Sequence, residues 1–389
     1  MPEAVIVSAV RTPIATAFKG SLRDTPAEIL AEIVVREAVA RSRFAPESVD
    51  DVLLAESMYG GGDLARYAAV AAGMVRAPGV ALNRHCAGSL TAVSMAAGSV
   101  RAGMDEVLVA GGVMSTSLSP QLTWRVPGTQ ETRTTPMPPT FPHYEGADDD
   151  VTLSTGWSTA VEAGLSREEV DAWALRSHQR AIAAIDAGVF DDEIVPVPVI
   201  GPEGPTDFVL DEHPKRTTTA EKLASLKPLH PEIDGFSVTA GNAAGVNDAA
   251  AALVITSDRR AHERGVEQLA TVQAWASVGV EPHRTGMAAT EVIPVVLKRA
   301  GLEVSDVDLW EINEAFASVP LAACRAHGID EARVNIYGSG CSLGHPVAAS
   351  GARMLTTLVH ELRRRGGGTA VAAMCAGGGQ GSAVVVRVG

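Results

Sequence analysis

The segment Asn335-Ile336-Tyr337-Gly338-Ser339-Gly340-Cys341-Ser342-Leu343-Gly344-His345-Pro346 decides how this chain of 389 residues is interpreted. It ends an apolar stretch and leads into the small-residue run 347–355. Proline suits the first turn of a helix because its missing N–H would be unpaired there, and the flanking glycines allow a sharp turn. We therefore expect His345 at a corner between a strand and a helix. A histidine in this position can also be a purely structural cap.

Two cysteines in similar surroundings favour a chemical role for His345. Cys86 lies in Asn83-Arg84-His85-Cys86-Ala87-Gly88-Ser89-Leu90, and Cys375 lies in Met374-Cys375-Ala376-Gly377-Gly378-Gly379-Gln380-Gly381. A thiolate is a strong nucleophile, and a helix N-terminus with a nearby histidine raises the ionised fraction of a thiol at neutral pH. The sequence thus predicts nucleophilic thiol chemistry, with a raised ionised fraction of Cys86.

Composition excludes several classes of protein. With 46% hydrophobic residues the chain can bury two or three cores of domain size. It has only four cysteines, and this low number argues against a disulfide framework and for a cytoplasmic protein. Lys plus Arg (32) minus Asp plus Glu (46) gives −14, which disfavours nucleic acid or an anionic membrane as partner. Neither a signal peptide nor a membrane span is expected.

Apolar runs alternate with helical periodicity at both ends of the chain, which indicates an α/β fold with a mostly parallel sheet. The expected strands are 4–10, 51–55, 79–83, 105–112, 249–256, 270–275, 309–313, 369–375 and 383–388. The expected helices are 26–41, 63–72, 87–103, 166–187, 291–300 and 317–327. The helix at 166 is opened by a capping box of Ser166 and Glu169.

The first and last thirds share one order of elements. A strand, a glycine-rich corner with a reactive residue, an alanine-rich helix and a further strand occur at 80–112 and again at 334–379. Between them, 114–150 is rich in Pro, Thr and Ser and has no clear period. We therefore expect a duplicated domain with pseudo-twofold symmetry. The N-terminal domain comprises 1–117 and 246–269, an inserted loop domain comprises 118–245, and the C-terminal domain comprises 270–389.

Several fragments of the sequence, taken together, resemble the thiolase family, which comprises the acyl-CoA acetyltransferases and 3-ketoacyl-CoA thiolases. The resemblance extends over nearly the whole chain. The matching fragments, in family order, are Ser8-Ala9-Val10-Arg11-Thr12-Pro13, the Cys86 corner, Ala110-Gly111-Gly112, 226–248, Asn313-Glu314-Ala315-Phe316, Gly344-His345-Pro346 and 375–381. The resemblance implies duplicated α/β domains in a five-layer αβαβα arrangement, with an inserted loop domain.

The resemblance also implies roles for individual residues. Cys86 attacks a thioester, His345 takes its proton, and Cys375 moves a proton at the α-carbon. One oxyanion hole consists of His345 and a water held by Asn313, and the other consists of the backbone N–H groups of Cys86 and Gly377. Alternatively, Asn313 caps a strand end and the glycines at 377–379 only permit a tight turn.

For ligands, the resemblance implies acyl-CoA and coenzyme A as substrate and product, with no permanently bound cofactor and no metal. Lys215 and Arg216 fall where the family has a basic residue near the nucleotide phosphates, although a charge run is more often a solvated face. Ala244 and Gly245 fall where the family often has Ser-Gly against the pantetheine. The resemblance further implies a homodimer or homotetramer formed through the sheet of the first domain.

Three departures from the family pattern leave the acyl specificity open. The segment that usually begins with Met-Gly reads Val151-Thr152-Leu153-Ser154-Thr155-Gly156-Trp157, the nucleophile is followed by Ala-Gly-Ser-Leu rather than x-Ser-Gly-Leu, and Ala110-Gly111-Gly112 lacks the usual following Glu. A specialised one-way condensing enzyme and a non-catalytic acyl-CoA-binding subunit are therefore alternatives. Retention of Cys375 favours thiolase chemistry over a decarboxylating condensing enzyme, and retention of both thiols, His345 and Asn313 disfavours a binding subunit.

Overall fold

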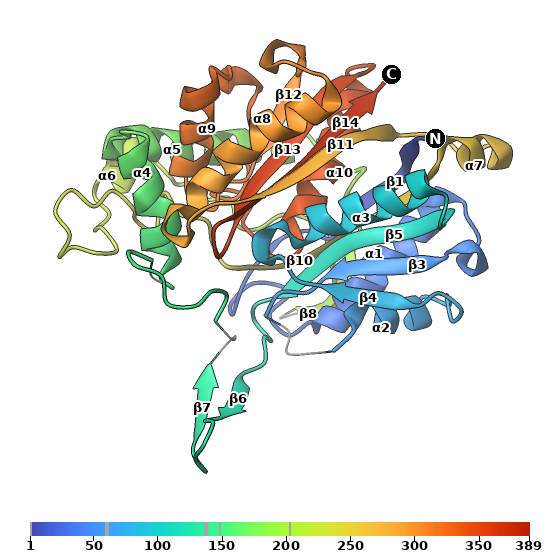
Figure 1. Ribbon diagram of the computed structural model, residues 1–389, viewed down its shortest axis with the longest axis horizontal. Helices are drawn as coiled ribbons and strands as arrows, with labels where there is room; N and C mark the ends of the chain where they lie inside the picture. The colour runs from blue at the N-terminus through green and yellow to red at the C-terminus, as the bar shows by residue number, and fades with distance from the viewer. Residues whose placement is uncertain (1, 59–61, 136–138, 148, 202–203) are drawn as a thin grey trace.

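One sheet runs through the molecule, and its central strands come from both ends of the chain (Figure 1). The computed structural model describes residues 2–58, 62–135, 139–147, 149–201 and 204–389. Within them the strands of this sheet follow the spatial order β12 (Leu309–Ile312), β13 (Gly368–Ala376), β14 (Gln380–Val388), β11 (Ala270–Gly279), β1 (Ala4–Arg11), β10 (Asn247–Ser257), β5 (Val107–Ser115), β3 (Asp51–Ala55) and β4 (Gly79–Leu82), with β2 (Ala15–Thr16) beside β10. A short antiparallel pairing of β11 with β1 joins the two halves.

The sheet is mixed, so the prediction of a mostly parallel sheet is wrong. β3 runs parallel to β4 and β5, and β12 runs parallel to β13, whereas the other neighbours are antiparallel. The direction changes because β10 lies antiparallel between β1 and β5, and because β13 turns directly into β14. That turn requires glycine, since Gly378 and Gly379 have φ of 78° and 74°.

Helices cover both faces of each half and give the predicted five-layer αβαβα arrangement. One outer layer contains α1 (Ala27–Ser42) and α2 (Leu64–Ala71), the central layer contains α3 (Gly88–Ala102) and α10 (Ser350–Arg364), and the other outer layer contains α8 (Ala288–Ala300) and α9 (Ser318–His327). Successive strand residues face opposite sides of a sheet. In β10, Val254 packs with α1, whereas Leu253 and Ile255 pack with the central helices.

The segment between β5 and β10 carries its own small elements. They are β6 (Leu122–Arg125), β7 (Thr132–Thr135), the π-helix η3 (Thr152–Trp157), α4 (Ser158–Glu162), α5 (Arg167–Asp186), β8 (Val197–Gly201), β9 (Gly204–Phe208) and α6 (Ala220–Ala224). The β6–β7 hairpin extends away from the body (Figure 1). The predicted capping box is confirmed, because Ser166 Oγ accepts from Glu169 N–H and Glu169 Oε2 accepts from Ser166 N–H.

The other short elements are η1 (Pro46–Ser48), η2 (His85–Ala87), α7 (Asp258–Arg264), η4 (Pro282–Met287), η5 (Val304–Asp306) and η6 (Glu331–Arg333). Part of the proline- and threonine-rich run, 136–138, lies outside the described residues. None of the helices in the described ranges has the length and apolar character needed to cross a membrane. The domain limits given above remain predictions.

The corner at His345 differs from its prediction. The apolar segment before it forms only an isolated parallel bridge, Val334 with Trp310, and regular helix begins at Ser350 rather than at Pro346. Tertiary hydrogen bonds explain why the helix begins later along the chain than expected. The side chain of Asn247 accepts the His345 backbone N–H at 2.9 Å, and His345 forms a bridge with Val246, so the backbone there stays extended.

A buried ion network ties β1 to the inserted segment. Arg11 Nε lies 2.6 Å from Glu193 Oε1, and its two terminal nitrogens lie 2.8 and 2.9 Å from the carboxylate oxygens of Asp211. Glu193 also accepts from Thr357 Oγ1 at 3.1 Å, and Asp211 accepts from the Ile14 N–H at 2.7 Å. Because all three charged groups are buried, each depends on the others for compensation.

We predict that Asp211→Asn lowers the free energy of unfolding by about 3–5 kcal/mol, since it leaves the buried Arg11 charge underpaired. Thermal and chemical denaturation would measure the loss. Asp24→Asn is the matched control, because the Arg23–Asp24 pair is exposed and its removal should cost less than about 1 kcal/mol. Equal effects of the two substitutions would contradict a stabilising role for the buried network.

Candidate active site

Cys86 is the one thiol that remains partly accessible. It lies in η2, the single turn between β4 and α3, whereas Cys324, Cys341 and Cys375 are buried. A nucleophile must be reachable by its substrate, and this condition singles out Cys86 among the four cysteines.

Burial raises the pKa of Cys86 to about 11, although the backbone N–H groups of Gly377 and of Cys86 itself act in the opposite direction. The prediction that the ionised fraction of this thiol is raised at neutral pH is therefore wrong. Regular α3 begins only at Gly88, and the free-energy cost of burying a thiolate exceeds the stabilisation that the nearby N–H groups give it. Cys86 rests as an uncharged thiol.

The glycine turn after β13 brings the second predicted cysteine to the first. The backbone N–H of Gly377 lies near enough to the Cys86 sulfur to favour its thiolate and so to act against the rise in its pKa. Burial, and then the neighbouring Cys86, raise the pKa of Cys375 above its ordinary range. The two sulfurs thus interact electrostatically although they come from opposite ends of the chain.

His345 is buried and oriented by a hydroxyl. Its Nδ1 lies 2.6 Å from Ser350 Oγ, which in turn donates to the carbonyl of Pro346 at 3.0 Å. This arrangement assigns the ring proton to Nδ1 and leaves the lone pair on Nε2, which is buried and has no partner among the described residues. Burial and the charge of Arg353 lower the pKa of His345 to about 4, so the ring is neutral at neutral pH.

Close packing docks the His345 loop onto the start of α3, directly after Cys86. Ser89 Oγ accepts from the Ala352 N–H at 2.9 Å. A Cβ on Gly351 would lie 2.8 Å from Leu90 N, and a Cβ on Gly112 would lie 2.0 Å from the carbonyl oxygen of Ala348. Only glycine permits these approaches.

Asn313 lies next to His345 and carries a second unpaired atom. It follows β12, and its Nδ2 lies 3.5 Å from His345 Nδ1, at the limit of a hydrogen bond. Its Oδ1 is buried without a partner among the described residues, so the amide oxygen does not cap the strand end. Two unpaired polar atoms, on Asn313 and His345, are costly to bury and are available to a polar ligand.

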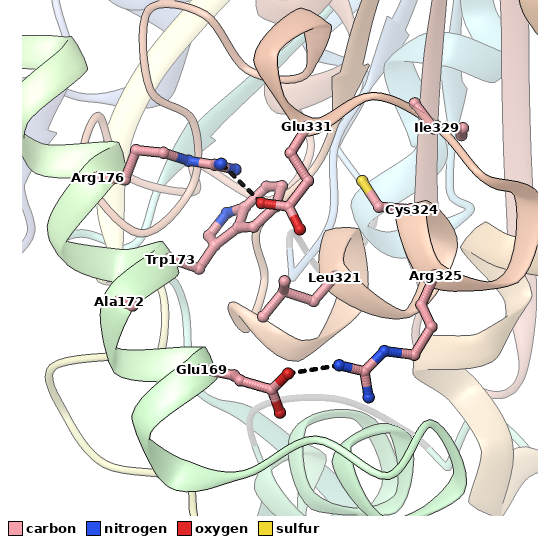
Figure 2. A pocket seen from close by; sticks show the side chains of 9 residues that line it. All are labelled: Glu169, Ala172, Trp173, Arg176, Leu321, Cys324, Arg325, Ile329 and Glu331. Carbon is pink, nitrogen blue, oxygen red and sulfur yellow. Dashed lines mark hydrogen bonds and ion pairs between the residues drawn. The ribbon is translucent and has the colours of Figure 1, made fainter.

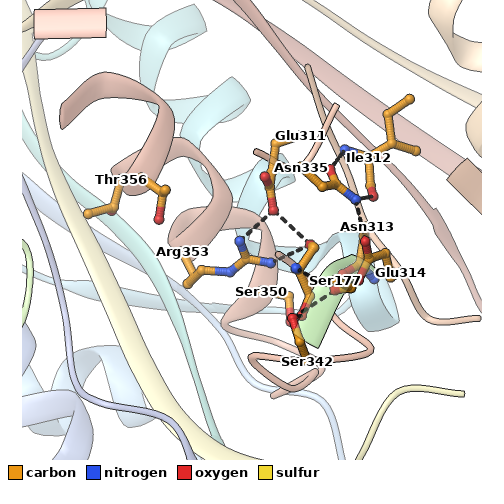
Figure 3. A network of polar contacts seen from close by, with 12 residues as sticks. Ser177, Glu311, Ile312, Asn313, Glu314, Asn335, Ser342, Ser350, Arg353 and Thr356 are labelled. Atoms are coloured by element: carbon orange, nitrogen blue, oxygen red, sulfur yellow. Dashed lines mark hydrogen bonds and ion pairs between the residues drawn. The ribbon is translucent and has the colours of Figure 1, made fainter. Parts of the chain in front are cut away.

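A buried polar network, which the sequence analysis missed, fixes the segment that carries Asn313 (Figure 3). Glu314 accepts from Trp173 Nε1 at 2.8 Å, Ser177 Oγ at 2.6 Å and Asn335 Nδ2 at 2.8 Å. Asn335 also exchanges two bonds with the backbone of Ile312. The sequence did contain one indication of this network, the acidic Glu314 directly after Asn313. An acidic residue in an otherwise apolar segment requires buried partners.

The second part of this network is the buried pair of Glu311 and Arg353, which shares Ser339 Oγ (Figure 3). It links β12 to α10 below the His345 loop. Cys341 is buried in the same region, where its sulfur lies 3.5 Å from the Asn242 carbonyl, so this thiol is structural rather than reactive.

The predicted coenzyme contacts fall into two groups. Ala244 donates its N–H to the carbonyl of Ala315 at 2.9 Å, which places Ala244 and Gly245 beside the Asn313 segment. Gly245 also has a packing role, since a Cβ there would lie 2.1 Å from the ring of His213. Lys215 and Arg216 are exposed, and Arg216 pairs with Asp186. The ion pair with Asp186 partly neutralises the positive charge of Arg216.

A pocket of about 410 Å³ lies elsewhere, between α5 and α9 (Figure 2). It is lined by Glu169, Ala172, Trp173, Arg176, Leu321, Cys324, Arg325, Ile329 and Glu331. None of the predicted site residues lines it. Its arginines are already paired, Arg176 with Glu331 and Arg325 with Glu169.

Comparisons with known proteins identify the family of this chain. Residues 4–259 match the N-terminal domain of thiolase and residues 266–388 match its C-terminal domain. The chain belongs to the thiolase family. It is 39% identical to the beta-ketothiolase BktB of Cupriavidus necator, with 98% of each chain covered, and 39% identical to an acetyl-CoA acetyltransferase of Pseudomonas aeruginosa, with 99% of each covered.

The thiolase fold is equally clear in three dimensions. The crystal structure of the Bacillus anthracis acetyl-CoA acetyltransferase superimposes with a TM-score of 0.91 at 37% identity, covering 100% of this chain and 99% of that one. The predicted family and fold are confirmed, and as a thiolase the protein is an acyltransferase.

We predict that Ser350→Ala slows acylation of this thiolase by about tenfold to a hundredfold, a part of the ~10²–10⁴ that a positioned general base supplies. Without the Ser350 hydroxyl, the proton on Nδ1 of His345 loses its acceptor and Nε2 is no longer fixed as the free nitrogen. Rapid-quench mass spectrometry would measure the rate of acyl-enzyme formation.

Ser94→Ala is the control, because Ser94 Oγ makes the same kind of helical bond, to the carbonyl of Leu90 at 2.7 Å, but touches no titratable group. If Ser350→Ala and Ser94→Ala both left the rate unchanged, Ser350 would not orient the base.

The raised pKa of Cys86 predicts the pH dependence of its alkylation in the free protein. Since the thiolate is the reactive form, the rate with iodoacetamide should rise about tenfold per pH unit through neutrality and level off only near the raised pKa of about 11. Peptide mapping after timed quenching would follow Cys86, with the buried cysteines as internal references. A rate independent of pH around neutrality would show a stable thiolate and contradict this account.

Proposed function

We propose that the protein transfers acyl groups reversibly between acyl-CoA or acetyl-CoA and 3-ketoacyl-CoA plus coenzyme A, by a ping-pong route through an acyl-Cys86 intermediate. The observations that carry the proposal are the interaction of the accessible Cys86 thiol with the second thiol, Cys375, and the unpaired nitrogen of His345 on a loop that packs against the start of α3. The names of its relatives, beta-ketothiolase and acetyl-CoA acetyltransferase, support this chemistry.

In the first half-reaction, the Cys86 sulfur attacks the thioester carbonyl carbon while its proton passes to Nε2 of His345. The bond between that carbon and the sulfur of coenzyme A breaks, and the departing thiolate takes the proton back from His345. The neutral resting state of both groups suits this exchange, because the base carries no proton and the nucleophile carries the one to be moved.

In the second half-reaction, Cys375 passes its own proton to the neutral Nε2 of His345 and, as thiolate, removes a proton from the α-carbon of acetyl-CoA. The resulting carbanion attacks the acyl-Cys86 carbonyl, a carbon–carbon bond forms, and the Cys86 sulfur leaves and takes the proton from His345. Burial is the main reason that the pKa of Cys375 is raised, and a charged Cys86 would raise it further. An acylated Cys86 carries no charge, so Cys375 can ionise in the acyl-enzyme without a second thiolate beside it.

Negative charge develops on a thioester oxygen in each half-reaction. The Gly377 and Cys86 N–H groups, which already face the Cys86 sulfur, form one oxyanion hole. His345, when Nε2 carries a proton, and a water held by Asn313 Oδ1 form the other, which uses the unpaired atoms of these residues. Preorganised donors of this kind are commonly worth about 3 kcal/mol each.

The proposal extends to ligand and assembly. Ala244 and Gly245 contact the pantetheine of coenzyme A, and Lys215 and Arg216 contact its phosphates from their exposed segment. The chain forms a homodimer or homotetramer through the sheet of the first domain, where β4 is an edge strand with exposed residues such as Val80. The four unpaired cysteines suit the cytoplasm.

We predict that brief incubation with short, long and branched acyl-CoAs adds one acyl group to the wild type and none to Cys86→Ala. Cys375→Ser should still be acylated but should lose condensation and thiolysis by at least about a hundredfold, since it lacks the base at the α-carbon. Intact-protein mass spectrometry would detect the adducts, and ultraviolet absorbance would follow the 3-ketoacyl-CoA.

Acylation of a folded Cys86→Ala variant would overturn the choice of nucleophile. If no donor acylated the folded wild type, the reading as a binding subunit would replace the proposal.

A further inference from the structure

The residue before the nucleophile has an unusual backbone conformation. His85 has φ of 45°, in the left-handed region that few residues other than glycine adopt, although histidine does so more often than most. Two hydrogen bonds hold it there, from its N–H to Asn83 Oδ1 at 2.9 Å and from Ser57 Oγ to its carbonyl at 3.2 Å. Backbone strain of this kind is retained mainly where it positions a functional group.

The strained backbone places the imidazole of His85 at the reactive centre. Its Cδ2 and Cγ lie 3.6 and 3.7 Å from the position that a Cβ on Gly377 would occupy, so the ring covers the residue whose N–H faces the Cys86 sulfur. Its Nε2 lies 3.1 Å from Thr140 Oγ1. Thr140 in turn lies over Gly378, within 2.5 Å of the corresponding Cβ position. The ring therefore lies between the turn that carries Cys86, the glycine turn at 377–379 and the part of the inserted segment that carries Thr140.

One ring nitrogen of His85 remains available. The described residues supply a partner to Nε2 but none to Nδ1. Burial lowers the pKa of His85, so the ring is neutral at neutral pH and Nδ1 can donate or accept a hydrogen bond according to its tautomer. The nearby guanidinium of Arg84 is engaged by Thr91 and Ser277, at 3.0 and 2.7 Å. The site thus offers an uncharged polar contact rather than a cation.

We propose that His85 is a specificity-determining residue, whose Nδ1 binds a hydroxyl or keto oxygen on the acyl chain carried by Cys86, with Thr140 as its positioning residue. This inference rests on the proposed function and adds a substrate class to it, acyl-CoAs with an uncharged polar substituent. A polar site discriminates strongly, because an apolar acyl chain bound against the half-buried ring excludes water from Nδ1 and leaves this atom unpaired.

The test compares matched donors that differ in one polar oxygen: butanoyl-CoA with 3-hydroxybutanoyl-CoA, and pentanoyl-CoA with 4-oxopentanoyl-CoA. The measured quantity is kcat/KM for acylation of Cys86, by rapid-quench mass spectrometry. The wild type should favour the polar member of at least one pair by about tenfold or more. His85→Leu should bring that ratio to about one or below, because it replaces the polar ring by an apolar side chain.

Two further variants separate specificity from structure. His85→Asn retains a polar side chain and tolerates the positive φ, so it should keep a higher ratio than His85→Leu even if acylation is slower overall. Thr140→Val removes the partner of Nε2 with little change of shape and should lower the ratio several-fold.

Each outcome bears on a different claim. A wild type that acylates Cys86 without preferring either polar donor, or a His85→Leu variant with the wild-type ratio, would overturn this inference and leave the proposed function intact. Absence of acylation by every donor in the folded wild type would overturn both.

Discussion

The contact between the beginnings of α3 and α10 is the constraint on which the site depends. Gly351 approaches the backbone of Leu90, and Ser89 accepts from the N–H of Ala352, so the two central helices meet at their first turns. Cys86 precedes one helix and His345 precedes the other. The two halves of the sheet pack on opposite sides of these two helices. The close approach of the helices to each other therefore fixes the position of Cys86 relative to His345.

Burial determines how the site can use its thiols. A water-poor environment favours uncharged forms, which raises the pKa of Cys86 and lowers that of His345. Both groups are then neutral at rest. In the proposed mechanism, charge develops only when substrate is present, near the backbone N–H of Gly377. The structure thus favours proton transfer during attack over a permanent thiolate and imidazolium pair.

Local features of the fold could be predicted from the sequence, whereas tertiary ones could not. The strand at 51–55 and the Ser166 capping box depend on neighbouring residues and agree with the structure. The direction of β10 and the start of α10 at Ser350 depend on distant partners such as Asn247, so patterns along the chain gave the wrong result. The prediction about the ionisation of the Cys86 thiol failed for the same reason, since burial is a property of the whole fold.

The candidate site shows the same division. Glycine corners and reactive residue types pointed to Cys86, His345 and Cys375, but no periodicity indicates that Glu314 accepts hydrogen bonds from Trp173 and Ser177. The same limit applies to His85. Its position beside Cys86 was visible in the sequence, whereas its positive φ and its bond to Thr140 required the folded chain.

A crystal structure of the acylated protein, trapped with Cys375→Ser, would test the central claim most directly. The account predicts one acyl group on Cys86, with its carbonyl oxygen within hydrogen-bonding distance of the Cys86 and Gly377 N–H groups and Nε2 of His345 facing the thioester. An acyl group on another residue, or a carbonyl oxygen turned away from Gly377, would contradict the account.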